Sequence, residues 1–199
     1  MRRNDIIESA EKLFFSSGYE NVSMDDIAKE MELARATLYL SFKNKDEIYI
    51  AIALKASRII SEMFKDICMK DDTGITKIRS ICLAYQEFYK KYTGFYMAYY
   101  HTGMFESDSS PMLDELRAIR KESFRMVVDA VKKGIKDETI SEDIDPTATP
   151  LIVLSMSNSA LNISPVTRMY MDSYGLTQDE YYDRTVDMVV RSIENVKKS

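Results

Sequence analysis

The sequence has 199 residues, of which 45% are hydrophobic and 30% charged, with a net charge of −5. A chain of this length buries roughly 70% of its unfolded surface and folds as one or two globular domains. The negative net charge argues against unspecific coating of nucleic acid but leaves room for a local DNA-binding patch. No window of about 18 apolar residues is present, so we expect no membrane partner.

Apolar residues recur at three- and four-residue spacing along most of the chain, which predicts an all-α protein of about nine helices. We expect an N-terminal three-helix helix-turn-helix domain over residues 1–47. A helical bundle for ligand binding and dimerisation should follow over residues 48–199. The predicted helices cover residues 5–17, 24–31, 35–41, 44–69, 75–92, 95–105, 112–136, 146–163 and 178–197.

Local signals mark several helix ends. Gly18 suits a left-handed residue that ends the first helix. Ser23 and Asp26 have the spacing of a capping box at the start of the second helix, and Asn44 can cap the fourth. Ser164 and Pro165 are expected to break the chain after the eighth helix.

Charge is unevenly distributed in the N-terminal region. Residues 1–50 hold ten Asp or Glu and seven Lys or Arg, a net charge of −3, yet residues 33–45 contain three basic residues and no acid. Arg3 also precedes the first acid. A short acid-free helix presented by two others is what a helix-turn-helix places in the DNA major groove.

The residues of this region predict particular contacts with double-stranded DNA. Arg35 can bind guanine with two hydrogen bonds, and Thr37 can contact a phosphate or a thymine methyl group. Lys45 and the backbone amides at the start of the fourth helix offer a phosphate site. The alternative is a three-helix bundle with a solvated face. The candidate DNA contacts are Ser23, Arg35, Ala36, Thr37, Tyr39, Ser41, Lys43 and Lys45.

The following helices are rich in Met and Tyr, which suits a pocket for a small apolar or aromatic effector. The alternative for each of these residues is the protein core or a dimer interface. Asn158, one turn from Asn162 on an apolar helix, needs a polar partner, either a ligand or the other subunit. The candidate ligand contacts are Phe64, Cys82, Tyr85, Tyr89, Met97, Tyr100, His101, Met104, Phe105, Met126 and Asn158.

The last two predicted helices each present a broad apolar face. Paired with their symmetry mates, they would form a four-helix homodimer interface, although a buried core could use the same residues. The candidate interface residues are Leu154, Met156, Leu161, Met188, Val189 and Ile193.

Residues suited to catalysis or metal binding are scarce. His101 is the only histidine and cannot build a metal site alone, and Cys68 and Cys82 are the only cysteines. Each thiol is expected to be a small buried hydrophobe in a reducing, cytoplasmic location, with redox sensing as the alternative. No nucleophile–base pair or phosphate loop is evident, so we expect neither an enzyme nor a cofactor or metal.

Residues 5–50 resemble the DNA-binding domain of the TetR/AcrR family of transcriptional regulators. The resemblance implies a homodimer with two recognition helices in successive major grooves of a palindromic operator. It implies that Thr37 and Tyr39 contact DNA, that Lys45 contacts a phosphate and that Phe42 belongs to the core. The matching residues are Ile7, Ala10, Leu13, Phe14, Gly18, Tyr19, Val22, Ser23, Met24, Ile27, Ala28, Leu33, Thr37, Leu38, Tyr39 and Phe42 to Ile48.

Three positions depart from the family pattern. Ala34 replaces the usual Ser or Thr before the recognition helix, which removes an N-cap worth roughly 1 kcal/mol. Ala36 stands where Gly is common, and Ser41 stands where His or Tyr is common, so one aromatic phosphate contact is missing.

The functional hypothesis is a ligand-responsive repressor. A ligand would change the spacing of recognition helices held about 34–36 Å apart and so release the operator. The alternative is a helical protein-interaction module that has lost DNA binding or ligand sensing.

Overall fold

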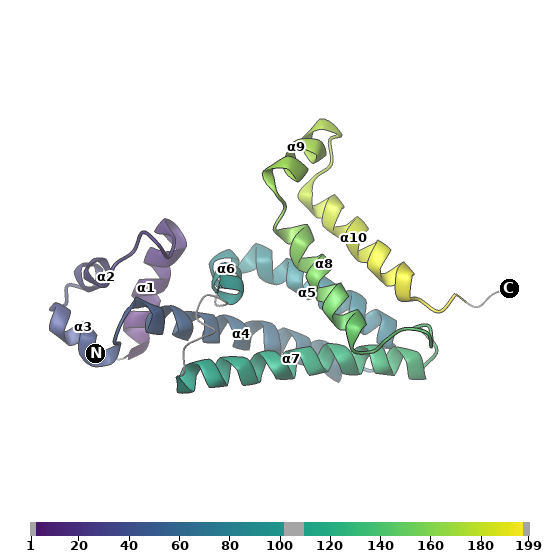
Figure 1. The fold of residues 1–199 in the computed structure, drawn as a ribbon, viewed down its shortest axis with the longest axis horizontal. Coiled ribbons are helices and arrows are strands. Elements are labelled where there is room, and N and C mark those ends of the chain that lie inside the picture. The colour runs from purple at the N-terminus through teal and green to yellow at the C-terminus, as the bar shows by residue number, and fades with distance from the viewer. Residues whose placement is uncertain (1–2, 102–109, 197–199) are drawn as a thin grey trace. The chain divides into compact units, whose positions relative to one another are not determined.

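The computed structural model describes residues 3–101 and 110–196, and in these ranges the chain is all-α, as predicted. Met104 and Phe105, two candidate ligand contacts, lie outside the described residues. Of the described helices, none is long and apolar enough to cross a membrane. The helices are α1 (Arg3–Ser17), α2 (Met24–Glu30), α3 (Arg35–Ser41), α4 (Lys45–Met69), α5 (Gly74–Lys91), α6 (Thr93–His101), α7 (Pro111–Lys136), α8 (Ala148–Leu161), α9 (Pro165–Ser173) and α10 (Gln178–Ile193) (Figure 1).

Helix α9 stands where only a break was expected. The hydroxyl of Ser164 accepts the Thr167 N–H at 3.0 Å and caps the new helix, and Pro165 is its first residue. Proline lacks an N–H and fits the first turn of a helix, where that group has no intrahelical partner. The same proline that ends one helix therefore starts the next.

The predicted helix ends of the N-terminal region are confirmed. Gly18 has a φ of +81° and donates its N–H to the Phe14 carbonyl at 2.9 Å. Ser23 and Asp26 form the capping box, with the Ser23 N–H donating to the Asp26 carboxylate at 2.8 Å. Asn44 Oδ1 accepts the Glu47 N–H at 2.9 Å. Helix α3 has no side-chain cap at Ala34, as its methyl group dictates.

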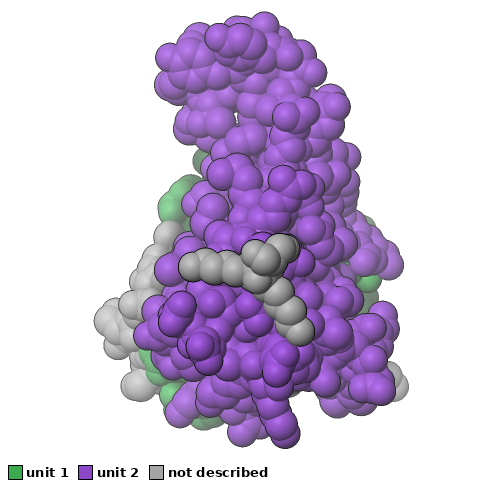
Figure 2. All heavy atoms as spheres, turned by 90° about the vertical axis from the view of Figure 1, so that its right-hand side faces the viewer, with its two compact units in different colours: residues 1–59, 92–119 green, residues 60–91, 120–199 purple. Residues whose placement is uncertain are grey.

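The chain packs into two compact units, coloured separately in Figure 2. Unit 1 comprises residues 1–59 and 92–119, and unit 2 comprises residues 60–91 and 120–199. Helices α4 and α7 each continue from one unit into the other. The boundary expected after residue 47 falls inside unit 1, because α6 and the first part of α7 pack with the helix-turn-helix. A functional division at residue 47 stays a prediction.

The core of unit 1 joins the three N-terminal helices to later parts of the chain. Helix α2 packs against both α1 and α3 (Figure 1). Ala98 of α6 and Leu113 and Leu116 of α7 are buried in the same cluster. The helix-turn-helix is thus completed by residues that lie far away in the sequence.

In unit 2, helices α5, α8 and α10 pack against one another. Tyr182 of α10 is fully buried, and its hydroxyl donates to the Cys82 carbonyl of α5 at 2.6 Å. Burial raises the pKa of the Cys82 thiol to about 11, so the side chain is a neutral apolar group at physiological pH, as expected. Cys68 is half-buried, with its thiol 3.9 Å from the Met126 carbonyl oxygen.

The capping box at Ser23 generates a stability prediction. Ser23→Ala removes the acceptor of the Asp26 N–H and should lower the free energy of unfolding by about 1 kcal/mol. The Ser23 side-chain and backbone hydrogen bonds hold the pKa of Asp26 below its usual value. This stabilisation is present above the unfolded pKa and is lost as the pH falls through the folded one, so the cost of the substitution should shrink in acid.

Urea unfolding followed by circular dichroism measures both effects. Ser61→Ala, the same change inside α4, serves as the control and should not lower the free energy of unfolding, because Ala favours a helix interior more than Ser does. Ala34→Ser should raise the free energy of unfolding, because it supplies the missing cap of α3. A cost of Ser23→Ala that stays the same from pH 7 down to the most acidic pH at which the protein remains folded would contradict the role of Asp26.

Candidate nucleic-acid interface

Helix α3 exposes almost its whole surface. Of its seven residues, Leu38 alone is buried, with 0% of its surface exposed. Leu40 lies two positions further, about 200° around the helix, and is 88% exposed. An isolated apolar side chain pointing to solvent from a short helix suits contact with a thymine methyl group. The sequence interpretation missed Leu40, although its phase relative to Leu38 would have revealed it.

The outward positions of α3 include most of the expected DNA contacts. Arg35, Ala36, Thr37 and Tyr39 are all exposed. Ser41, at the end of the helix, is half-buried, and its carbonyl is already an acceptor for Arg3 at 3.2 Å. The exposed face of α3 therefore comprises Arg35 to Leu40 without Leu38.

A surface hollow of about 370 Å³ lies beside α3. It gathers four expected DNA contacts from three different elements: Ser23, Arg35, Tyr39 and Lys45. Ala36, Thr37, Ser41 and Lys43 do not line it. The acids Glu20 and Asp25 do, so its charge is mixed rather than purely positive.

Arg35 is held by a neighbouring acid. Its Nε lies 2.9 Å from Asp25 Oδ1, and its guanidinium carbon lies 5.6 Å from the centre of the Tyr39 ring. A side-chain hydrogen bond with Tyr39, together with the charge of Asp25, raises the pKa of Arg35. Both partners of the ion pair are exposed, so the pair adds little stability. Arg35 can exchange Asp25 for a base or phosphate at small cost.

Lys45 starts α4 and contacts the loop after α1. Its Nζ donates to the Tyr19 carbonyl at 3.1 Å and lies 4.3 Å from the centre of the Tyr19 ring. The Tyr19 hydroxyl donates to Asp46, the next residue of α4. Burial and this hydrogen bond raise the pKa of Tyr19, so the phenol stays protonated. Tyr19 therefore fixes the position of the proposed phosphate-binding lysine.

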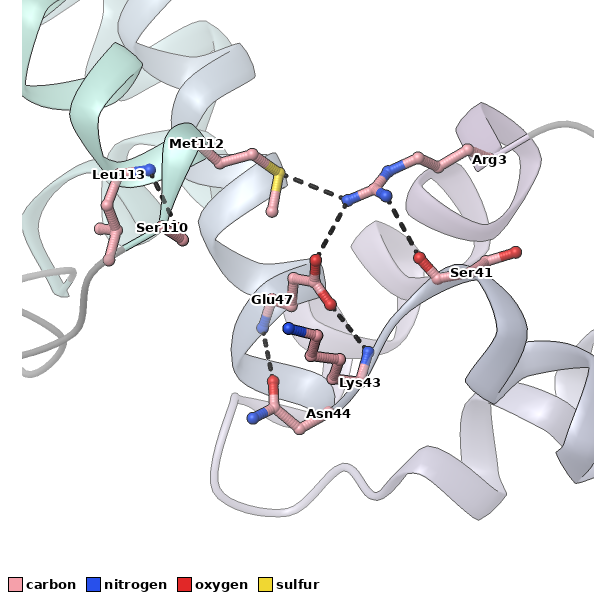
Figure 3. A network of polar contacts seen from close by, with 8 residues as sticks. All are labelled: Arg3, Ser41, Lys43, Asn44, Glu47, Ser110, Met112 and Leu113. Carbon is pink, nitrogen blue, oxygen red and sulfur yellow. Dashed lines mark hydrogen bonds and ion pairs between the residues drawn. The ribbon is translucent and has the colours of Figure 1, made fainter.

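The turn between α3 and α4 is tied to other helices by Arg3 (Figure 3). Its guanidinium group donates to the Ser41 carbonyl and to Met112 Sδ at 3.4 Å, and it lies 3.7 Å from Glu47. The same group stacks 4.0 Å from the centre of the Phe42 ring. These contacts make Arg3 an anchor of the turn, and the contribution of its positive charge to DNA binding stays a prediction.

The beginning of α4 is partly capped from within. Lys43 donates its N–H to Glu47 Oε2 at 2.7 Å, and Asn44 caps the Glu47 N–H (Figure 3). The side chain of Lys43 is exposed. The expected phosphate site therefore depends on the Lys43 and Lys45 ammonium groups more than on the backbone amides of this turn.

The expected ligand contacts divide between the two units. Phe64, Cys82 and Tyr85 are buried in unit 2, where the rings of Phe64 and Tyr85 lie 5.3 Å apart. Tyr89, Met126 and Asn158 are half-buried in the same unit. Met97, Tyr100 and His101 belong to α6 in unit 1. The residues of the list do not form one site in a single unit.

Asn158 has a partner within its own chain. Its Oδ1 accepts a hydrogen bond from the Asn162 amide at 2.7 Å, and Asn162 is exposed at the end of α8. This contact satisfies part of the hydrogen-bonding capacity for which a ligand or a second subunit was expected.

Half of the expected dimer residues lie in the core of their own subunit. These are Leu161, Val189 and Ile193, each at most 5% exposed. Leu154 is half-buried, whereas Met156 and Met188 are exposed. The exposed side of α8 also carries Leu151 and Ile152, at 56% and 57%. An apolar helix has an inner and an outer apolar face, and sequence periodicity alone does not tell them apart.

Within residues 3–101 and 110–196, no three His, Cys, Asp or Glu side chains gather in a way that could hold a metal ion. His101 lies exposed at the end of α6.

Known proteins resemble this chain in two ways. Residues 6–52 match the family model for bacterial regulatory proteins of the tetR family. Over 70 residues the chain is 41% identical to an HTH-type transcriptional regulator of Staphylococcus aureus strain USA300, a match covering 35% of this chain and 37% of that regulator. The sequence match thus spans about a third of the curated relative.

The fold likeness extends over the whole chain. A TetR/AcrR-family transcriptional regulator from Thermobifida fusca superposes with a TM-score of 0.73 at 21% identity, covering 100% of this chain and 99% of that one. AibR, solved with isovaleryl coenzyme A and operator DNA, gives a TM-score of 0.73 at 20% identity, covering 94% and 97%. Residues 6–52 are thus similar to the DNA-binding domain of bacterial regulatory proteins of the tetR family, and the chain as a whole has the fold of a TetR/AcrR-family regulator.

Proposed function

We propose that this protein is a homodimeric, sequence-specific DNA-binding transcriptional regulator, acting as a repressor that a small molecule releases from a palindromic operator. The observation that carries the proposal is the exposed face of α3, with Arg35, Thr37, Tyr39 and Leu40 turned outward from a helix anchored by Leu38. Side chains of these types on one short helix can contact both base edges and phosphates.

The balance of charge fits a reader of specific sites better than a general DNA-binding protein. Asp25 and Glu20 stand beside Arg35 and Lys45 on the same hollow. Acids that lie beside the proposed phosphate contacts repel the DNA backbone, and this repulsion weakens binding to every sequence equally. Specific contacts made by Arg35 and Thr37 must then provide much of the affinity, which raises the ratio of specific to unspecific binding.

Release by an effector requires a connection between the units. Helix α4 has 25 residues, of which the first part, including Lys45, belongs to unit 1 and the last part, including Phe64, belongs to unit 2. A ligand that binds two arrangements of unit 2 unequally could change DNA affinity through this continuous helix. We propose an apolar or aromatic effector near Phe64 and Tyr85. AibR, of similar fold, was solved with a coenzyme A thioester.

Dimerisation is proposed through the outer face of α8 together with α10. Leu151, Ile152 and Met156 are exposed on α8, and Met188 is exposed on α10, which packs beside α8. Exposed apolar side chains that gather on neighbouring helices support an interaction surface. A second copy would bury them in a symmetric four-helix contact.

The experiment that tests the proposed function is selection of genomic DNA fragments by the purified protein, read by sequencing. A short palindrome should be enriched. Arg35→Ala should then cost about 1–3 kcal/mol and relax the base preference at one position per half-site, whereas Lys45→Ala should weaken all sequences alike and lower the salt slope by about one.

Lys65→Ala, on an exposed part of α4, should bind as the wild type does. If protein stripped of ligand by unfolding and refolding still enriches no sequence over bulk DNA, the regulator proposal fails. An interaction module, the alternative, predicts that Arg35→Ala and Lys45→Ala leave its activity unchanged.

The ion pair between Asp25 and Arg35 provides a second prediction. Asp25→Asn removes a negative charge near the DNA phosphates and frees Arg35, so DNA should bind several-fold more tightly at low salt, with a gain that fades as salt screens the field. Fluorescence anisotropy across a salt series measures this effect.

Asp71→Asn, the same change in an exposed loop, is the matched control and should have no effect. Weaker binding by Asp25→Asn would instead mean that Asp25 orients Arg35 for base contact.

The proposed dimer face predicts the effect of a buried charge. Ile152→Glu should convert the dimer into a monomer, since an unpaired carboxylate in an apolar interface is strongly unfavourable. Size-exclusion chromatography with light scattering measures the mass in solution. The affinity for the palindrome should fall when the dimer is lost. Met69→Glu, at an exposed position of α4, should remain dimeric. A dimeric Ile152→Glu protein would show that another face forms the interface.

A further inference from the structure

A second feature of unit 1, separate from the DNA-facing surface of α3, is a cavity of about 440 Å³ between α1, the first turns of α4, and α6. All the residues that line it belong to unit 1. They are Phe14, Phe15, Gly18, Tyr19, Tyr49, Thr93, Gly94, Met97 and His101.

The cavity exists because α6 meets α1 through a glycine. A Cβ added to Gly94 would lie 2.2 Å from the Phe15 ring, so no other residue allows this approach. Phe15 also packs edge-on against Phe95, with ring centres 5.1 Å apart. Met97 and His101 follow Gly94 at helical spacing and line the cavity from the same helix. The contact between Gly94 and Phe15 thus forms one wall of the cavity.

The walls of the cavity are aromatic. Phe14, Tyr19 and Tyr49 form one cluster, with the rings of Phe14 and Tyr49 edge-on at 5.4 Å and those of Tyr19 and Tyr49 at 4.7 Å. Phe15 and Met97 remain 40% and 39% exposed. A ligand that removes this apolar area from water binds with a favourable hydrophobic contribution.

The lining also fixes the charge of a suitable ligand. None of the nine lining residues is Asp, Glu, Lys or Arg, and the polar side-chain groups are those of Thr93 and His101 and the hydroxyl groups of Tyr19 and Tyr49. A multiply charged ligand, such as a coenzyme A thioester, would lose its hydration here without a salt bridge in return. A neutral ligand with one hydrogen-bonding group meets no such cost.

The volume sets the size of the ligand. A dry cavity of about 150 Å³ holds one benzene molecule, and ligand pockets generally measure about 300–1,000 Å³. We propose that this cavity is a binding site for a neutral molecule of two or three aromatic rings, distinct from the effector site proposed in unit 2.

Tyr19 connects this site to the proposed DNA contacts. Its ring lines the cavity, its carbonyl accepts from Lys45 at 3.1 Å, and its hydroxyl donates to Asp46. A ligand packed against the Tyr19 ring acts on the residue that positions the phosphate-binding lysine. This coupling rests on the proposed function, whereas the binding site itself does not. Ligand and DNA must then change each other's affinity by the same factor.

The site is tested with N-phenyl-1-naphthylamine, a neutral three-ring dye that fluoresces in apolar surroundings. The full-length protein should bind it saturably. Its sulfonated analogue, 8-anilino-1-naphthalenesulfonate, has the same rings and one negative charge, and should bind at least about tenfold more weakly. Equal affinity for the two dyes would overturn the assigned ligand class.

Met97→Trp fills the cavity and should weaken binding of the neutral dye by about tenfold or more. Met69→Trp makes the same change at an exposed position in unit 2 and should leave binding unchanged. Unchanged binding by a folded Met97→Trp protein would overturn the site.

A measurement on the wild-type chain does not depend on how these variants fold. With 13C-labelled methionine methyl groups, the neutral dye should shift the Met97 signal and leave the Met69 signal in place. An unshifted Met97 signal at saturating dye would refute the site.

The coupling has its own readout, which is the affinity for the selected palindrome with and without dye. Saturating dye should shift that affinity several-fold in the wild type and leave it unchanged in Met97→Trp. An affinity that does not move would overturn the coupling. Failure to select any DNA would overturn the regulator proposal and leave the dye-binding result standing.

Discussion

The burial of two side chains, Leu38 and Phe42, holds the candidate interface together. Helix α3 has seven residues and no side-chain cap, and a helix this short is unstable in isolation. Leu38 and Phe42 are 0% and 1% exposed in the core of unit 1. Their burial fixes the helix at two points one turn apart. Every outward side chain of α3 depends on this anchorage for its direction.

Charged residues stabilise the turn that follows α3. Arg3 binds the Ser41 carbonyl, stacks on Phe42 and approaches Glu47, so three segments are joined through one guanidinium group. Lys45 contacts both the carbonyl and the ring of Tyr19. A cation held in this way is pre-positioned, so the proposed contact with a phosphate would cost less side-chain entropy.

Because it includes helix α6, unit 1 is built from segments that are not continuous in the sequence. Ala98 enters the core of the helix-turn-helix, and Gly94 packs on Phe15. Both residues follow directly after α5, which belongs to unit 2. The chain therefore leaves and re-enters unit 1, and α4 and α7 cross between the units as continuous helices. These two continuous helices connect the units covalently, and the proposed response to an effector depends on that connection.

The sequence by itself determined the all-α class, the helix-turn-helix and the helix ends at Gly18, Ser23 and Asn44. These features depend on residues within a turn of one another, so local periodicity and capping reveal them. Even α9 had its local signal in Ser164 and Pro165. Only the tertiary structure paired Asp25 with Arg35, made Arg3 an anchor and placed Met97 opposite α1. It also buried Leu161 and exposed Ile152. Such outcomes depend on which faces of distant helices meet. When a helix has apolar residues on several sides, its sequence does not identify the side that packs in the core.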